Sequence, residues 1–307
     1  MRLSHDVFSE QGGVMQKKVG FVGVGLMGGW LAKHLLAAGY PVTAYDTDPS
    51  KVDAIVKEGG KKTDSPDQIA PQVDVLILSL PDSSVVNKVV RHNLRLFETG
   101  RKGLIVIDCS TADPAMSETL AAELGEKGIE MLDATISGTS EMCAVKDTIF
   151  MVGGAKAVYE QCVPLFAAMG RESVYMGDSG KGAAIKLVVN LVLSLNRMAL
   201  AEGLTLAKKA GLDQLQTLEV LKKSAAFSKA MDQKGYRMVE RRFLPPAGYL
   251  STHYKDVRLM LALGARLDCP LPLISLNAQA LASEICKGRG DWDSSDIISF
   301  YDALANL

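Results

Sequence analysis

Aromatic residues, excess charge and long apolar runs are all scarce in this sequence. Aromatic side chains make up 6% of its 307 residues, and 34 basic against 35 acidic side chains leave a net charge of −1. That balance gives no support to a nucleic-acid or anionic-membrane partner. The longest apolar run, over 187–195, contains Asn190 and Ser194 and falls short of the roughly 18–20 residues that span a bilayer. We therefore expect no nucleic-acid and no membrane partner.

Cysteine and histidine are also sparse and unpatterned. The five cysteines include no C-x-x-C pair, and the four histidines share no metal-ligand spacing with them. An odd, unpatterned cysteine count is typical of the reducing cytoplasm, so we expect a cytoplasmic protein without a metal site. Residues 1–16 lack the apolar core of a secretion signal and are interpreted as a flexible tail, or as residues upstream of a natural start at Met15.

One long helix is predicted from residue 180 to about residue 211. Apolar residues lie on nearly every side of it, which predicts a helix that is buried all round. Four polar residues nevertheless share a stripe about 80° wide on this helix: Lys186, Asn190, Ser194 and Arg197. A lysine in a desolvated stripe has a lowered pKa and can exchange protons near neutrality. The alternative is a structural lysine whose long stem reaches water near the helix start.

The N-terminal part carries a strand, a glycine-rich turn, a helix and a second strand. The valine-rich run 17–24 is interpreted as a buried parallel strand that leads into Gly23-Val-Gly-Leu-Met-Gly28. Helical spacing follows over 26–38, and 41–45 forms a second strand that Asp46 closes. This order is typical of dinucleotide-binding folds, and the alternative is a glycine-rich turn in an ordinary α/β domain.

Each key residue of this unit has a predicted task. Gly23 allows the tight turn, Gly25 lets the backbone approach a pyrophosphate, and Gly28 lets the helix pack close to the strand. The helix N-terminus then faces the phosphates with free N–H groups. Asp46, about 20 residues further on, can accept hydrogen bonds from the ribose hydroxyls and repel a 2′-phosphate. The sequence therefore predicts NAD or NADP as cofactor and favours NAD, although Lys51 could still approach a 2′-phosphate.

Strands and helices alternate up to about residue 179, and only helices follow. Further strands are expected over 73–80, 104–109, 129–134, 148–152 and 173–176, with helices over 83–92, 114–127 and 155–169. After the long helix, more helices are expected over 213–223, 229–242, 251–265, 271–287 and 294–304. The pattern predicts an α/β fold: a Rossmann-like, doubly wound, mainly parallel sheet in residues 17–179, followed by an all-helical domain in residues 180–307. Lys186 would then lie at the cleft between domains, where small-molecule sites tend to occur.

Polar or turn-forming residues follow three of the predicted strands. These clusters are Leu80-Pro81, Ser110-Thr111 and Ser137-Gly138. In doubly wound sheets, ligands bind beyond the carboxyl ends of the strands, so the clusters are candidate binding residues. The alternative is that their serines and threonines cap turns or helices.

Four motifs in this order resemble the β-hydroxyacid dehydrogenase family, which includes 3-hydroxyisobutyrate dehydrogenase, tartronate semialdehyde reductase and succinic semialdehyde reductase. The opening GFVGVGLMGGWLAKHLLAAGYPV resembles the family's cofactor motif, and DATISGT at residues 133–139 resembles its substrate motif. Gly180-x-Gly-xxx-Lys186-xxx-Asn190 matches the catalytic segment, and Lys255-Asp256 resembles a C-terminal pair that closes over the site. The resemblance runs from about residue 17 to the C-terminus.

The resemblance implies a role for each matched residue. Lys186 would be the general acid or base, and Asn190 would orient the substrate beside it. Ser137 and Gly138 would hold the carboxylate of a small substrate, with Thr139 near its hydroxyl. The implied cofactor contacts are Gly23, Gly25, Leu26, Met27, Gly28, Asp46, Leu80, Pro81, Thr111 and Lys255, of which Lys255 would also contact the substrate.

The implied activity is the NAD(P)-dependent interconversion of a small β-hydroxy acid and its semialdehyde by a homodimer or homotetramer. Departures from the motifs leave the exact acid open: Thr135 replaces the usual proline, Thr139 a glycine, and Val189 an asparagine common in the family. Two alternatives remain, an imine-reducing relative on the same scaffold and a dinucleotide-binding scaffold without turnover. Lys186 counts against both, since such relatives usually lack the lysine.

Overall fold

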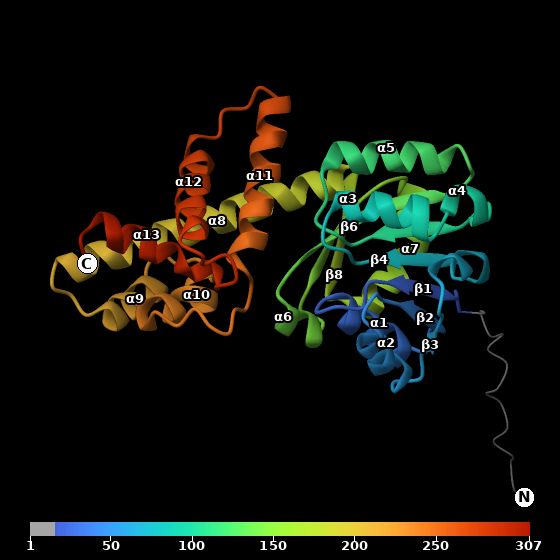
Figure 1. Ribbon diagram of the computed structural model, residues 1–307, viewed down its shortest axis with the longest axis horizontal. Helices are drawn as coiled ribbons and strands as arrows, with labels where there is room; N and C mark the ends of the chain where they lie inside the picture. The colour runs from blue at the N-terminus through green and yellow to red at the C-terminus, as the bar shows by residue number, and fades with distance from the viewer. Residues whose placement is uncertain (1–15) are drawn as a thin grey trace, which may run out of the picture.

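The computed structural model describes residues 16–307 of the chain (Figure 1). An eight-stranded sheet has the order β3-β2-β1-β4-β5-β6-β7-β8, and only the neighbours β6 and β7 are antiparallel. The strands are β1 Val19–Val22, β2 Val42–Tyr45, β3 Lys61–Lys62, β4 Val75–Leu78, β5 Ile105–Asp108, β6 Glu130–Ser137, β7 Ile149–Gly153 and β8 Glu172–Gly177. Apart from Gln16, the predicted flexible tail 1–16 lies outside the described residues.

Helices cover both faces of the sheet. They are α1 Gly28–Ala37, α2 Pro49–Val56, α3 Ser83–Lys88, α4 Leu96–Thr99, α5 Pro114–Gly125, α6 Ser140–Ala144 and α7 Lys156–Met169, with the short turns η1 Pro66–Gln68, η2 Ala70–Gln72 and η3 Val89–Asn93. Helices α1, α2 and α7 pack on one face, and α3, α4 and α5 pack on the other (Figure 1). This is the doubly wound arrangement that strands alternating with helices predict.

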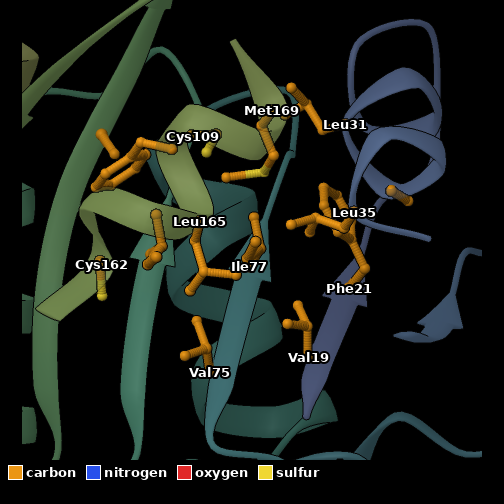
Figure 2. Packing of buried hydrophobic residues seen from close by; sticks show 14 of the residues in the cluster. Val19, Phe21, Leu31, Leu35, Val75, Ile77, Cys109, Cys162, Leu165 and Met169 are labelled. Carbon is orange, nitrogen blue, oxygen red and sulfur yellow. The ribbon is translucent and has the colours of Figure 1, made fainter. Parts of the chain in front are cut away.

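The central strands β1, β4 and β5 are buried at every position, and most of their residues are apolar. Val19 and Phe21 of β1 belong to the cluster that includes Leu35 of α1 and Leu165 of α7 (Figure 2). Val22 of β1 faces the opposite cluster, since successive side chains of a strand point to opposite faces. Each fully buried large apolar side chain of this kind contributes about 1.5–3 kcal/mol.

Every regular element that the structure describes after β8 is helical. These elements are α8 Lys181–Lys209, α9 Gln214–Lys223, α10 Lys229–Glu240, α11 Leu250–Arg266, α12 Pro272–Cys286, η4 Ser294–Asp296 and α13 Ile297–Leu304. The predicted fold is therefore confirmed: a mainly parallel Rossmann-like sheet is followed by an all-helical domain that starts with the long helix. The elements that were not expected are α2, α4, α6, the two-residue strand β3 and the short turns η1 and η2. Strand β6 ends three residues later than predicted, because it pairs with β7 up to Ser137.

The prediction that the long helix is buried all round is wrong for the single chain. Val188, Val192 and Leu206 of α8 are 51%, 53% and 70% exposed. The helix runs from the sheet into the helical domain, so its middle passes between the two with one side uncovered (Figure 1). Among residues 16–307, α8 is the one helix long and apolar enough to cross a membrane, by length and composition. In the fold it packs against β6, β7, α10 and α13, as the core helix of a globular domain does.

The start of α8 is fastened to β6 by the buried carboxylate of Asp133. Its two oxygens accept hydrogen bonds from the backbone N–H groups of Gly180 and Ala183, each at 2.8 Å. The Thr135 hydroxyl donates to the Gly182 carbonyl at 2.6 Å. A Cβ at Gly182 would lie 2.1 Å from the Asp133 carbonyl oxygen, so only glycine allows this approach. Because the first N–H groups of a helix have no partners within it, Asp133 supplies the acceptors that a buried helix start requires.

We predict that Asp133→Ala lowers the free energy of unfolding by about 3 kcal/mol or more, since it leaves two buried N–H donors unpaired. The control is Asp213→Ala, which removes the carboxylate that caps the exposed start of α9 by accepting from Gln216 N–H at 2.7 Å. That change should cost about 1 kcal/mol, because water can replace the lost acceptor. Urea unfolding followed by circular dichroism measures both, and equal losses would contradict the assignment.

Candidate active site

A cavity of about 550 Å³ lies where the sheet meets the helical domain. The glycine loop before α1, the end of β6, and helices α8, α10 and α11 all contribute to its wall. Of the residues predicted as functional, it brings together Leu26, Met27, Ser137, Gly138, Thr139, Lys186 and Asn190. The cavity therefore places predicted cofactor residues beside predicted substrate residues.

Lys186 projects from the second turn of α8 toward the end of β6. Its Nζ donates a 2.6 Å hydrogen bond to the backbone carbonyl of Ile136. Burial lowers the pKa of Lys186 from 10.5 to about 8; the Asp256 carboxylate opposes this shift, and the positive charges of Arg197 and Lys255 add to it. The ammonium group can therefore lose or regain a proton close to physiological pH.

A chain of polar contacts links α8, α11 and the loop after β4. Asn190 Nδ2 donates to Asp256 Oδ2 at 3.1 Å, and Lys255 Nζ lies 3.2 Å from Asp256 Oδ1. Lys255 Nζ also donates to the Pro81 carbonyl at 2.9 Å. The predicted pair Lys255-Asp256 thus reaches across from the helical domain to the sheet. It brings Lys255 to Pro81, as expected if both are near the nicotinamide.

The residues after β6 form a tight turn at the edge of the cavity. Gly138 has φ +148°, and a Cβ there would lie 2.7 Å from the Thr148 side chain, so a larger residue would clash. Thr139 Oγ1 accepts a 3.3 Å hydrogen bond from Met142 N–H and caps α6. Its hydroxyl is therefore partly committed to the helix, a role that the sequence analysis had not assigned to Thr139.

The glycine loop has the geometry that a dinucleotide requires. Gly23 has φ +88°, and a Cβ there would lie 2.3 Å from the Ser79 carbonyl oxygen. A Cβ at Gly28 would lie 2.0 Å from the Gly23 carbonyl oxygen, whereas at Gly25 it would meet no atom within 4 Å. No side chain caps the start of α1 at Met27. An open backbone position beside an uncapped helix N-terminus fits a pyrophosphate.

Asp46 is held against this loop. Its Oδ2 accepts from Val24 N–H and its Oδ1 from Asp48 N–H, each at 2.9 Å. Lys51 Nζ lies 4.0 Å from the same carboxylate. The carboxylate is only 10% exposed and supports the glycine loop. It directly follows β2, at the position where the sequence analysis predicts an acid that binds the ribose. A carboxylate has about four lone-pair sites, so it can accept further hydrogen bonds.

Three other predicted residues, Leu80, Pro81 and Thr111, lie at strand ends outside the cavity wall. Leu80 N–H donates to Ser110 Oγ at 2.9 Å, which ties the end of β4 to the residue before Thr111. Leu80 also lies close to the Gly23 turn. Leu80, Pro81 and Thr111 thus gather at the carboxyl ends of β4 and β5, next to the glycine loop. Among residues 16–307, no three His, Cys, Asp or Glu side chains are grouped so that they could hold a metal ion.

The cavity wall also includes residues that the sequence analysis did not assign to the site. They are chiefly polar or basic: Asn196, Arg197, Lys229, Gln233, Lys234, Thr252, His253 and Ser294. Arg197 and Ser194 had been placed on the same stripe as Lys186, and this stripe was the signal for them. His253 Nε2 and Ser194 Oγ share a hydrogen bond of 2.6 Å. Burial lowers the pKa of His253 well below its usual range. His253 is therefore uncharged at neutral pH.

Both halves of the chain match known dehydrogenase families. Residues 18–177 match the NAD binding domain of 6-phosphogluconate dehydrogenase, and residues 180–301 match the NAD-binding domain of NADP-dependent 3-hydroxyisobutyrate dehydrogenase. A 3-hydroxyisobutyrate dehydrogenase from Mycobacterium tuberculosis, solved with L-serine, superposes with a TM-score of 0.84 at 26% identity, over 93% of this chain and 99% of that one.

Curated relatives resemble the chain over nearly its whole length. 2-(Hydroxymethyl)glutarate dehydrogenase of Eubacterium barkeri is 30% identical over 94% of this chain and 96% of its own. Glyoxylate/succinic semialdehyde reductase 1 of Arabidopsis thaliana is 32% identical over 92% and 97%. The cytokine-like nuclear factor N-PAC of Xenopus tropicalis is 31% identical over 91% of this chain but only 51% of its own length. With both family matches and these identities, the chain belongs to the 3-hydroxyisobutyrate dehydrogenase-like family of NAD(P)-dependent β-hydroxyacid dehydrogenases.

Proposed function

We propose that the protein interconverts a small β-hydroxy acid and its semialdehyde acid, with Lys186 as the general acid and base. The observation that carries this proposal is the position of Lys186. Its ammonium group lies in the cavity, has a pKa of about 8, and is held by the Ile136 carbonyl beside the turn at Ser137 and Gly138. A proton donor whose pKa lies near the working pH is the most effective acid–base catalyst.

The cofactor supplies or accepts the hydride, and the protein moves the proton. In oxidation, neutral Lys186 accepts the proton that leaves the substrate hydroxyl. In reduction, protonated Lys186 donates to the carbonyl oxygen. The hydrogen bond to the Ile136 carbonyl fixes the direction of the ammonium group, and the hydrogen bond from Asn190 to Asp256 fixes the amide beside it. Holding both groups in place lowers the entropy cost of reaching the reactive geometry.

The turn after β6 is the proposed carboxylate site. Ser137 and Gly138 lie at the cavity edge, within reach of the same space as Lys186. Lys255, bonded to the Pro81 carbonyl, closes the site from the helical side. The names of two relatives support this substrate class, since glyoxylate, succinic semialdehyde and 2-(hydroxymethyl)glutarate each combine a carboxylate with an aldehyde or hydroxyl group.

A cofactor-binding role without turnover is the second candidate. This second candidate is favoured by the 31% identity to N-PAC, which is named as a nuclear factor and not as an enzyme. The proposal of an enzyme rests on the placement of Lys186. A steady-state screen with glyoxylate, succinic semialdehyde, tartronate semialdehyde and methylmalonate semialdehyde separates the two: absence of turnover despite tight binding of NADH or NADPH would favour the second candidate.

We expect Lys186→Met to lower kcat at least ~100-fold, the usual scale for an acid–base residue, and to leave the dissociation constant for the cofactor nearly unchanged. Lys181→Met is the matched control, because Lys181 is exposed at the start of the same helix. Turnover should stay within about twofold in the control. Retained turnover in Lys186→Met would rule out Lys186 as the acid–base group.

The pH dependence of kcat/KM should have opposite signs in the two directions. Oxidation needs neutral Lys186, so its rate rises as the pH passes through about 8; reduction needs the protonated form, so its rate falls over the same range. Both profiles are measured with wild type under the same buffer and ionic strength. Two profiles that rise together would contradict the assignment.

We further propose that NAD is preferred over NADP because the Asp46 carboxylate repels a 2′-phosphate. Asp46→Asn should lower the ratio of kcat/KM for NADH to that for NADPH by roughly tenfold, the scale of one close charge pair near the surface. Asp48→Asn is the control, since this neighbouring acid caps α2 by accepting from Ser50 N–H at 3.0 Å. An unchanged ratio in Asp46→Asn would remove Asp46 from cofactor selection.

A further inference from the structure

A second cationic group lies on the cavity wall beyond Lys186. Arg197 follows Lys186 by three helical turns on α8, so both side chains lie on the same face. Their Cα atoms are about 16 Å apart along the helix axis. The charge of Arg197 contributes to the lowered pKa of Lys186, so the two groups interact electrostatically within the site.

Arg197 has no carboxylate of its own in the part of the chain that the structure describes. Its Nη1 donates to Ser294 Oγ at 3.0 Å. The acid groups whose charge acts on it are Asp293 and Asp256, and both have other cations. Lys234 donates to both oxygens of Asp293 at 2.8 Å. Asp256 pairs with a lysine of its own helix. The guanidinium therefore keeps N–H donors for a group inside the cavity.

The Arg197 side chain is only partly buried and lies on the cavity wall. Burial lowers the pKa of Arg197 to about 10, which still leaves it charged at neutral pH. A cation that loses part of its hydration is normally paired with an anion. Among the residues that line the cavity, four are basic (Lys186, Arg197, Lys229 and Lys234) and one, Asp256, is acidic. Lys229 and Lys234 are paired with Asp232 and Asp293, so Lys186 and Arg197 are the cations of the described cavity wall that remain for the two negative charges of an anion.

We propose that Arg197 and Ser294 bind a second carboxylate of the substrate, at the opposite side of the cavity from the reacting carbon. This inference rests on the proposed function and narrows its substrate class to hydroxy acids and semialdehyde acids that carry two carboxylates. A planar guanidinium and one hydroxyl match the two oxygens of a carboxylate, which arginine binds in a forked geometry. Ser137 and Gly138 hold the first carboxylate, and the carbon chain between the two acids lies along α8.

The test measures binding and needs no turnover. Isothermal titration calorimetry on the full chain loaded with NAD⁺ compares three dicarboxylates, succinate, glutarate and adipate, with the monocarboxylates of equal length, butanoate, pentanoate and hexanoate. At least one dicarboxylate should bind 10- to 100-fold more tightly than its matched monocarboxylate, the scale of one charge-assisted hydrogen-bonded pair. Equal affinities within all three pairs would overturn the proposal.

Two substitutions of Arg197 and one control locate the effect. Arg197→Met, of similar length without the charge, should abolish the preference for the dicarboxylate, and Arg197→Lys should keep part of it. The control Lys229→Met removes the same charge from the same cavity, but Lys229 is 67% exposed and paired with Asp232 at 3.6 Å. The Lys229→Met variant should keep the preference for the dicarboxylate over the matched monocarboxylate. An equal loss in Lys229→Met would indicate a general charge effect and contradict a specific site, as would a preference that survives in Arg197→Met.

Failure of this inference and failure of the proposed function give different results. A protein that reduces monocarboxylate semialdehydes and shows no preference for dicarboxylates retains the proposed function and loses the Arg197 site. A protein that prefers dicarboxylates through Arg197 but turns over no hydroxy acid or semialdehyde retains the site and loses the proposed reaction. Circular dichroism and the dissociation constant for NADH confirm that each variant is folded before these results are compared.

Discussion

Two hydrogen bonds from the start of α8 to the buried carboxylate of Asp133 fix the helix on which the site is built. They satisfy N–H groups that would otherwise be buried without partners. They also set the rotation of α8 against β6, because Gly182 allows the two backbones to touch. With that rotation fixed, Lys186, Asn190 and Arg197 face one cavity, since they share one stripe of the helix.

The chemistry follows from where this stripe is buried. Burial disfavours the charged form of Lys186, whereas the Ile136 carbonyl and the nearby Asp256 carboxylate stabilise that charged form. The balance leaves its pKa close to neutrality. Lys255 ties the helical domain to the loop after β4, which holds the two walls of the site together. Charged groups in a partly enclosed cavity of this kind interact more strongly than they would in water.

Much of the fold and the core of the site could be predicted from the sequence, because their signals are local. The glycine loop is read from consecutive residues, and Gly23 and Gly28 show the turn and the close packing expected of them.

Contacts between distant segments could not be predicted in this way. Asp133 caps a helix 47 residues further on, and an acid within an apolar strand was the only hint of it. Thr139 had been assigned to the substrate, but its hydroxyl also caps α6, which no periodic pattern revealed. Arg197 was placed on the correct stripe, yet its lack of a carboxylate partner depends on how Lys234 and Asp293 pair in the folded chain.

The most direct test of the central claim is the titration of Lys186 itself. NMR of the protein labelled with ¹³C and ¹⁵N at lysine follows each side chain between pH 6 and 11, and Lys186→Met assigns the signal. The account predicts one lysine that titrates near pH 8 and is absent from the variant, because burial on α8 disfavours its charge. If every lysine titrates near 10.5 and the variant removes one of these ordinary signals, Lys186 is solvated, and the proposed acid–base role loses its physical basis.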